Sequence, residues 1–439
     1  MRKSLFLIMG VRCPIMDKLI YDSFLDILRE ELVPAMGCTE PIAVAYAAAL
    51  ARDTLGCMPE KTTLIVSGNI IKNVKSVVVP NTGGRKGLRT AVAAGLCFGK
   101  AEKELEVISE ATDSDLKALD AYLETAEIRL QEADSDQPFD LAVSLSAGSD
   151  TAYVHIVSHH TNVVCIRKND ETLLEKPFSN ETIQAPENRS LLTVERIVEF
   201  AGCVDIEEVR PVLQRQIDYN IAIAKEGLSG EYGAGIGKIL LRSYGNTVFN
   251  RAKAWAAAGS DARMDGCELP VVINSGSGNQ GITTSVPVIV YALELGVSHE
   301  MLLRALVISN LVTIHLKTGI GSLSAYCGAT SAGAGAGAGI CYLYGGGCDE
   351  ISHTIVNVLA INSGMICDGA KASCAAKIAS AVESGMLGMR MYMHDSQFYG
   401  GDGIVVKGVE NTIRAVSEIA REGMRGTDKE VIRLMMSTS

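Results

Sequence analysis

Apolar residues recur at intervals of three and four through residues 17–32, the spacing of one buried helix face. We expect this helix to end before Pro34, because proline lacks the N–H that a continuing helix needs. A second helix is predicted through the alanine-rich run after Pro41, since the first turn of a helix accepts proline at no cost. Both ends of the connecting stretch, "VPAMGCTEP", are therefore fixed by proline.

The pattern changes to short β-branched segments over residues 62–80, which predict strands, and then to a glycine-rich turn leading into a helix over 81–100. From 126 to 176, short apolar segments alternate with turn residues, a pattern typical of antiparallel strands. Asn169-Asp170 is a plausible hairpin turn between two of them.

Helical spacing dominates again after about residue 188. The sequence therefore predicts the α+β class, with a mostly helical region and a smaller α+β domain containing antiparallel strands, inserted after the first helices. We assign residues 17–54 and 189–439 to the helical region, 55–188 to the α+β domain and 1–16 to an N-terminal extension.

The N-terminal apolar run is interrupted by Gly10 and Arg12 and is too short for the core of a signal peptide. We therefore expect a cytoplasmic protein that begins at Met1 or at Met16. Residues 318–348 carry no charge and are long enough to span a bilayer, but Gly, Ala and Ser dominate them. This segment is predicted to be buried where backbones pack closely, so no membrane partner is expected.

Composition narrows the choice of function. The 439 residues carry a net charge of −11, which argues against a nucleic-acid partner because such partners need clustered Lys and Arg. The 12 cysteines, in a protein that we expect to be cytoplasmic, indicate free thiols, metal binding or catalysis rather than disulfides.

Five cysteines fall within fifty residues of one another late in the chain. If the segment around Cys367 and Cys374 is helical, their seven-residue spacing places both thiols on one side. A third thiol, best Cys327 but alternatively Cys341 or Cys348, would complete three sulfur ligands. Three thiolates and an open position suit an iron–sulfur cluster that leaves one iron for substrate. The alternative is that these cysteines are buried as small hydrophobic residues.

A glycine-rich stretch, "NSGSGNQG", follows the strand-like "LPVVIN" and precedes a helix. Gly276, Gly278 and Gly281 match the G-x-G-x-x-G pattern of nicotinamide-dinucleotide sites. That fold needs a second parallel strand after the helix, whereas residues 297–317 have a helical pattern.

The same stretch fits a simpler anion site. Backbone N–H groups at a helix N-terminus attract a carboxylate, and polar side chains flank them here. A helix-capping loop without a ligand is an equal alternative. The candidate binding residues are Ser275, Ser277, Asn279 and Gln280.

The opening stretch places three reactive groups ahead of the second helix. A helix N-terminus lowers the pKa of a nearby thiol such as Cys38, whereas the charge of Glu40 opposes this shift. Thr39 is a plausible helix cap. His159 and His160 fall at a strand-to-turn position and are expected to be solvated.

Three long motifs, "MGCTEPIAVAYAAALA", "NSGSGNQGITTSVPV" and "CDGAKASCAAKIASA", occur in this order and cover the chain from about residue 17. They resemble the L-cysteine desulfidase family, a UPF0597-type family related to the alpha chain of iron–sulfur L-serine dehydratase. The resemblance implies β-elimination on L-cysteine, which gives hydrogen sulfide, ammonia and pyruvate. In the serine relatives water leaves instead.

The resemblance also implies roles for particular residues. An oxygen-sensitive [4Fe-4S] cluster would be held by Cys327, Cys367 and Cys374, and Cys38 would act as the base at the α-carbon. Thr39 and Glu40 would bind the substrate ammonium or cap the turn, while the glycine-rich loop would hold the carboxylate. The expected partners are a small amino-acid substrate and further copies of the chain in a homo-oligomer.

Two other classes of function remain open from the sequence, a nicotinamide-dependent oxidoreductase and a non-catalytic sulfur- or metal-binding protein. The lyase hypothesis makes a geometric prediction. Cys38 should lie close to the three late cysteines despite some three hundred intervening residues.

Overall fold

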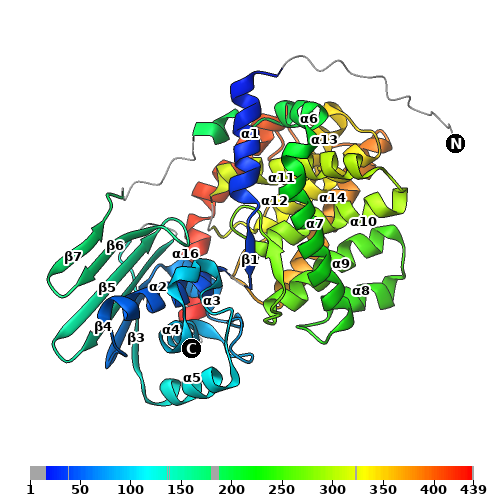
Figure 1. Ribbon diagram of the computed structural model, residues 1–439. Helices are drawn as coiled ribbons and strands as arrows, with labels where there is room; N and C mark the ends of the chain where they lie inside the picture. Colours follow the sequence, from blue (N-terminus) through cyan, green and yellow to red (C-terminus); the bar gives the residue numbers. More distant parts are fainter. Residues whose placement is uncertain are drawn as a thin grey trace.

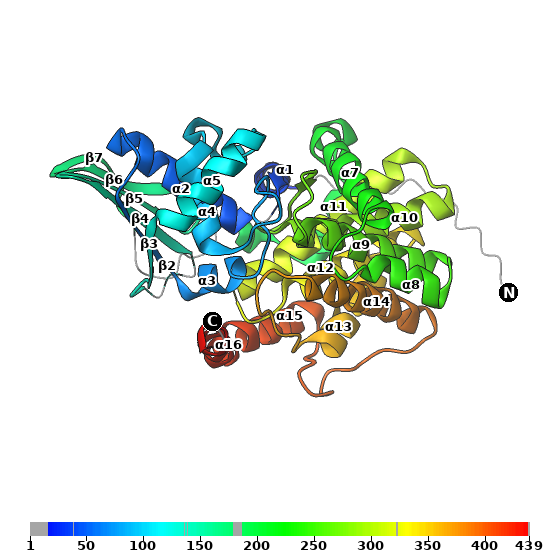
Figure 2. The same cartoon turned by 90° about the horizontal axis from the view of Figure 1, so that it is seen from below.

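The computed structural model describes residues 16–37, 39–135, 137, 139–178, 187–321 and 324–437. Two hydrophobic cores lie side by side, one inside a bundle of helices and one between a sheet and its covering helices (Figures 1 and 2). The predicted α+β class is confirmed.

The helical part buries the larger core. Within it, the short strand β1, which follows α1, pairs with β8, which precedes α10. Its elements are α1 (Lys18–Glu31), β1 (Pro34–Met36), η2 (Glu187–Leu191), α6 (Val194–Cys203), α7 (Ile206–Ser229), α8 (Ile236–Tyr244), α9 (Val248–Met264), β8 (Pro270–Val272), α10 (Gly278–Leu295), α11 (His299–Ile320), α12 (Gly328–Leu343), α13 (Cys348–Asn362), α14 (Ser373–Met393), α15 (Val409–Glu418) and η3 (Ile419–Gly423).

The sheet part is built on six strands in the order β3-β2-β4-β5-β6-β7. All neighbours are antiparallel except β2 and β3, so the sheet is mixed. Asn169-Asp170 forms the predicted hairpin turn between β6 and β7. The elements are α2 (Thr39–Leu55), β2 (Lys61–Val66), α3 (Gly68–Val74), α4 (Gly87–Phe98), η1 (Ala101–Glu106), α5 (Asp113–Thr125), β3 (Glu127–Glu132), β4 (Asp140–Ala147), β5 (Asp150–Val157), β6 (Val163–Lys168) and β7 (Glu171–Glu175).

Two segments differ from the sequence prediction. Residues 68–74 form the helix α3 rather than a strand, because Ile70 and Val74, four residues apart, both point into the core. α2 buries its alanine-rich face in the core of the sheet part and not in that of the helical region, to which the sequence analysis assigns residues 17–54. The last helix, α16 (Arg425–Ser437), leaves the helical part and packs against α3.

The glycine–alanine run forms α12, a helix buried at the centre of the bundle. Its glycines let neighbouring backbones approach closely, since a Cβ at Gly333 would overlap the carbonyl oxygen of Ala381 in α14. Within the described residues, α11 is the one helix long and apolar enough to cross a membrane, and 78% of its apolar window is buried inside the protein.

We expect Gly333→Ala to destabilise the protein by about 1–3 kcal/mol, because the added methyl group must displace backbone of α14. The matched control is Gly202→Ala in α6, where a Cβ meets no atom within 4 Å. Helix propensity should make this control neutral or stabilising by up to about 1 kcal/mol. Chemical unfolding measures both; equal stability of the two variants would contradict the close packing.

A buried carboxylate links α9 to α8. Asp261 is 1% exposed, and its Oδ2 accepts the backbone N–H of Gly237 at 3.2 Å. Burial raises the pKa of Asp261 to about 6, although backbone N–H groups of the first turn of α8 oppose the shift.

The raised pKa of Asp261 gives stability a pH dependence. The folded state binds this proton more tightly than the unfolded state, whose pKa is 3.8, so the stabilisation is complete below pH 3.8 and is lost as pH rises through about 6. Relative to Asp261→Asn, the free energy of unfolding of the wild type should fall by about 2–3 kcal/mol between these values. Urea unfolding from pH 4 to 7 tests this, and parallel pH profiles would contradict it.

Candidate active site

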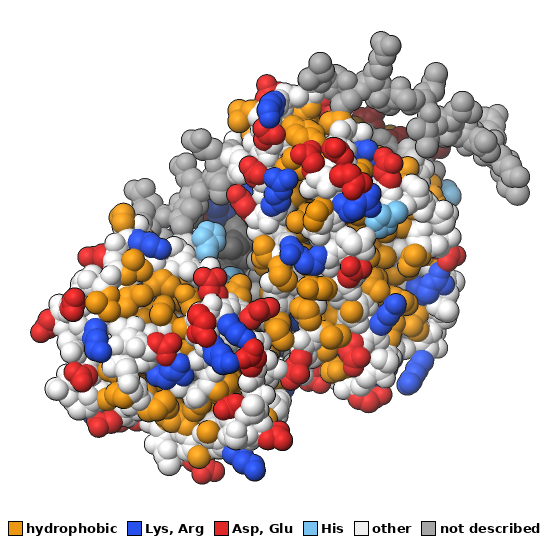
Figure 3. Space-filling model, viewed as in Figure 1, with side chains coloured by type: hydrophobic (Ala, Val, Ile, Leu, Met, Phe, Trp, Pro, Cys, Tyr) orange, Lys and Arg blue, Asp and Glu red, His pale blue; other side chains and the backbone are white. Residues whose placement is uncertain are grey.

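A cavity of about 120 Å³ lies where the two parts meet. Seen from outside, Lys and Arg are interspersed with Asp and Glu on the face of Figure 3, with no basic patch on that face. The cavity is lined by Thr39, Glu40, Lys72, Asn73, Arg263, Ser275, Gly276, Ser277, Asn279, Gln280, Lys317, Ser324, Tyr326, Cys327, Gly328, Ala329, Cys367, Gly369, Ala370, Cys374, Lys377 and Ile378.

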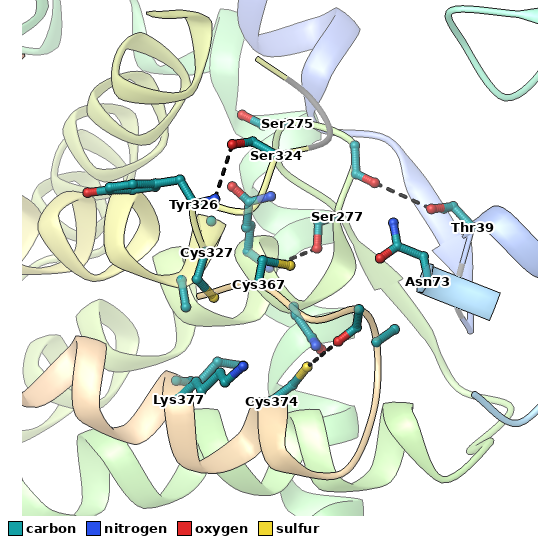
Figure 4. A pocket seen from close by; sticks show the side chains of 18 of the residues that line it. Thr39, Asn73, Ser275, Ser277, Ser324, Tyr326, Cys327, Cys367, Cys374 and Lys377 are labelled. Atoms are coloured by element: carbon teal, nitrogen blue, oxygen red, sulfur yellow. Dashed lines mark hydrogen bonds between the residues drawn. The ribbon is translucent and has the colours of Figure 1, made fainter. Parts of the chain in front are cut away.

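The three preferred cluster ligands and the candidate substrate-binding residues all line this one cavity, whereas Cys38 lies outside the described residues. Thr39, which follows Cys38 directly, faces the cavity from the side opposite the thiols (Figure 4). The distance predicted between Cys38 and the late cysteines therefore stays a prediction.

A pairing of extended backbone brings Cys327 and Cys367 together. Tyr326 and Ile366 form an isolated antiparallel bridge. On either side of it, the N–H of Cys327 donates to Met365 O at 3.0 Å and the N–H of Cys367 donates to Ala325 O at 2.6 Å. The two thiols consequently lie side by side although forty residues separate them.

Cys374 reaches the same cavity from the first turn of α14, where its thiol lies 3.6 Å from Gly369 O. The helix expected through Cys367 and Cys374 is wrong, because α14 begins only at Ser373 and the preceding residues turn sharply. Gly369 makes this turn possible with φ +91°, and a Cβ there would overlap the carbonyl oxygen of Lys72 in α3.

Charge in the cavity favours a thiolate at Cys367. A hydrogen bond from the Cys327 thiol lowers the pKa of Cys367 and raises that of Cys327, and the positive charges of Lys72 and Lys317 lower the pKa of Cys367 further. Burial raises the pKa of the third thiol, Cys374.

The two lysines are themselves held in place. Burial lowers the pKa of Lys317 to about 8, and its Nζ donates to Gly321 O at 2.6 Å. Lys72, whose side chain is 1% exposed, pairs with Asp428 of α16. The C-terminal helix therefore holds a cation beside the thiols.

The three thiols that line the cavity are the kind of donor that an iron–sulfur cluster needs. Among the described residues, no group of three or more His, Cys, Asp or Glu side chains is arranged to hold a metal ion. Iron–sulfur clusters are held by cysteine thiolates. Three thiols around one cavity, with lysines that offset thiolate charge, fit this arrangement.

The alternative third ligands lie elsewhere. Cys341 is buried near the far end of α12, fourteen residues from Cys327, and Cys348 begins α13. Fourteen helical residues span roughly 21 Å. Neither of these two thiols lines the cavity.

The glycine-rich loop forms a tight turn between β8 and α10. Ser275 and Gly276 take positive φ values of 49° and 73°, and Ser277 caps α10 by accepting the N–H of Gln280. The carboxylate of Glu31, at the end of α1, accepts the Ser275 N–H and pairs with Arg189 at 2.9 Å. Burial raises the pKa of Glu31, while Arg189 and that N–H oppose the rise.

The opening stretch reaches this loop because β1 pairs with β8. Residues 34–36 and 270–272 lie in register, so the segments that follow them meet. The Thr39 hydroxyl lies 3.2 Å from Glu40 Oε2 and 3.4 Å from Gly276 O, and it can donate its one proton to either oxygen. Asn73 in α3 donates to Glu40 Oε1 at 3.0 Å.

Sequence reasoning missed several cavity residues. Lys72 and Asn73 fell in a segment predicted as strand, and Arg263 and Lys317 lie inside long helices where nothing local marks them. The one available signal was Lys317 itself, which follows a long run of mostly apolar residues in α11.

The environment of the histidine pair also differs from expectation. His159 is exposed, but His160 is half-buried against Phe139, with ring centroids 4.8 Å apart. A Cβ on Gly276 would come 4.0 Å from His160 Cε1, so this ring borders the glycine-rich loop. Burial lowers the pKa of His160, and Glu40 opposes the shift.

A dinucleotide does not fit this site. β8 has three residues and pairs antiparallel with β1, and α10 is followed by the predicted helix α11 rather than by a strand. A cavity of about 120 Å³ is also far below the roughly 300–1,000 Å³ of sites for drug-sized ligands.

Thiols, buried cations and a helix N-terminus surround one small cavity, as is typical of a site for a small ligand. Comparison with known families agrees. The model of the serine dehydratase alpha chain family matches residues 102–433, and the chain belongs to this family, a family of lyases.

Relatives match along nearly the whole chain. A UPF0597 protein of Desulfitobacterium hafniense (strain Y51) is 55% identical, covering 95% of this chain and 97% of its own. UPF0597 proteins of Lachnoclostridium phytofermentans and Treponema denticola are 49% and 46% identical, over 95% and 96% of this chain and 100% and 99% of theirs.

The charge distribution predicts an order of thiol reactivity. In cluster-free protein at pH 7, iodoacetamide should alkylate Cys367 before Cys374, because only the Cys367 pKa is lowered. Lys72→Gln should slow alkylation of Cys367, whereas the surface control Lys103→Gln should not. Peptide mass spectrometry gives the rates; faster labelling of Cys374 would contradict the electrostatic account.

Proposed function

We propose that this protein is an iron–sulfur-dependent lyase that converts L-cysteine to hydrogen sulfide, ammonia and pyruvate by β-elimination. The observation that carries the proposal is the convergence of Cys327, Cys367 and Cys374 on the cavity that also holds the glycine-rich loop. The family, known for iron–sulfur serine dehydratases, supports the same chemistry.

In this proposal the three thiols hold a [4Fe-4S] cluster. When bound, the cluster supplies Lewis-acidic iron that polarises the substrate. Lys72 and Lys317 offset the negative charge of the thiolates. In this proposal the small cavity between the two parts limits the orientations that the substrate can take.

Cys38 is the proposed base, whose Sγ takes the proton from the α-carbon. The resemblance of "GCTEP" to the family motif supports this role, as does the position of Thr39 in the cavity. Loss of the α-proton and of the β-thiol leaves aminoacrylate, which water hydrolyses to pyruvate and ammonia. In this proposal Glu40, which lines the cavity, accepts a hydrogen bond from the substrate ammonium.

L-serine dehydration is the second candidate, because the matching family model is that of the serine dehydratase alpha chain. The same residues would act, and water would leave in place of hydrogen sulfide. The choice depends on how well the β-substituent fits beside the thiols.

Products from protein purified without oxygen test the proposal. Sulfide and pyruvate from L-cysteine, both lost after exposure to air, are the expected result, because an open iron makes a cluster oxygen-sensitive. If only L-serine gives pyruvate, the protein is an L-serine dehydratase instead. No product from either amino acid, in protein that contains iron and sulfide, would overturn the proposed function.

The ligand assignment gives a separate prediction. Serine at Cys327, Cys367 or Cys374 should remove most of the visible iron–sulfur absorbance and at least 100-fold of the activity, an estimate for loss of one of three ligands. Cys341→Ser, a buried thiol outside the cavity, is the matched control and should keep both. Full absorbance in any of the three variants would remove that residue from the ligand set.

A further inference from the structure

Arg263 is a buried cation without a partner in the cavity. It lies at the end of α9, is 3% exposed, and its Nε has no hydrogen-bond partner. No acidic side chain in the described ranges pairs with its guanidinium. An unpaired buried charge is costly, so a partner that arrives from outside is expected.

The other cations of the cavity are already engaged. Lys72 pairs with Asp428, and Lys377 pairs with Asp368. Lys317 donates to the backbone carbonyl of Gly321. Arg263 is thus the cation left for a ligand among the described lining residues.

The position of Arg263 suits a carboxylate. Its side chain crosses the first residue of α10, Gly278, where a Cβ would overlap Nε and Cζ. The guanidinium therefore lies beside the helix N-terminus, and both the planar fork and the free N–H groups of the helix favour a carboxylate.

Buried acceptors without partners complete the pattern. Asn279 Oδ1 and Gln280 Oε1 line the same cavity without hydrogen-bond partners. Acceptors near a free guanidinium complement the ammonium and carboxylate of an α-amino acid. A simple organic anion has no donor for these acceptor oxygens, whereas the ammonium of an amino acid does.

We propose that Arg263 binds the α-carboxylate of the amino-acid substrate as a bidentate anchor. The proposal rests on the proposed function and adds the residue that selects α-amino acids. It also explains why residue 278 is glycine, since any side chain there would displace the guanidinium.

The test compares Arg263→Gln and Arg263→Lys with the wild type, all as anaerobic holoenzyme with measured iron content. Arg251→Gln is the matched control, an arginine on the same helix that pairs with Glu294 outside the cavity. The expected KM for L-cysteine rises about 100-fold in Arg263→Gln and about 10-fold in Arg263→Lys, which keeps the charge but loses the fork. The control should keep the KM, and kcat should stay within about threefold in every variant.

A stability readout separates an anchor from a structural residue. Because the unpaired charge is costly, Arg263→Gln without ligand should melt at or above the wild-type temperature. A lower melting temperature together with an unchanged KM would mean that Arg263 is structural, and would overturn the proposal.

A binding readout stands apart from turnover. L-alanine, which has the carboxylate and ammonium but no leaving group, should raise the melting temperature of the wild type and not that of Arg263→Gln. Ethylamine, which lacks the carboxylate, should stabilise neither. If the wild type binds L-alanine in this way but turns over neither cysteine nor serine, the proposed function fails and the anchor stands. If L-alanine stabilises both proteins equally, the anchor fails whatever the activity.

Discussion

The site depends on two backbone hydrogen bonds between residues 325–327 and 365–367. They fix Cys327, the N-cap of α12, beside Cys367, and the turn at Gly369 then brings in Cys374 at the start of α14. Neither segment is part of a larger sheet, so the pairing is held by the helices around it. The buried glycine–alanine helix α12, which starts directly after Cys327, sets the position of one strand because its backbone packs tightly on α14.

The charges around the cavity then determine whether its thiols can be present as thiolates. Thiolates in a buried cavity are stable only where positive charge compensates them, and Lys72 and Lys317 supply that charge. Lys72 comes from the sheet part and is itself held by Asp428 of the last helix. The positive charge beside the thiolates is therefore in place only when the two parts and the C-terminal helix are packed together.

The cations of the cavity have different roles because they lie in different places. Lys72 and Lys317 lie with the thiols, whereas Arg263 lies with the glycine-rich loop at the start of α10. A substrate bound between them would have the thiols at one end and Arg263, the proposed carboxylate anchor, at the other. The opening stretch, aligned by the β1–β8 pairing, closes the third side through Thr39 and Glu40.

Sequence patterns predicted the α+β class and the strands of residues 126–176, because local spacing specifies them. The family motifs predicted part of the cavity lining, because they name its thiols and its glycine-rich loop. Sequence patterns failed where tertiary packing decides. Residues 68–74 are rich in β-branched residues yet form α3, since Ile70 and Val74 share a core-facing side only in a helix. The turn before Cys374 depends on contact between Gly369 and Lys72, and the role of Arg263 depends on an absence of partners, neither of which has a local signature.

The central claim is that three protein thiols hold a cluster and leave one iron open to the substrate. Mössbauer spectra of ⁵⁷Fe-enriched protein, recorded without oxygen before and after addition of L-cysteine, test it most directly. The account predicts a cluster spectrum in which one iron site of the four changes when L-cysteine binds. A spectrum without cluster iron, or one that L-cysteine leaves unchanged while sulfide is released, would contradict it.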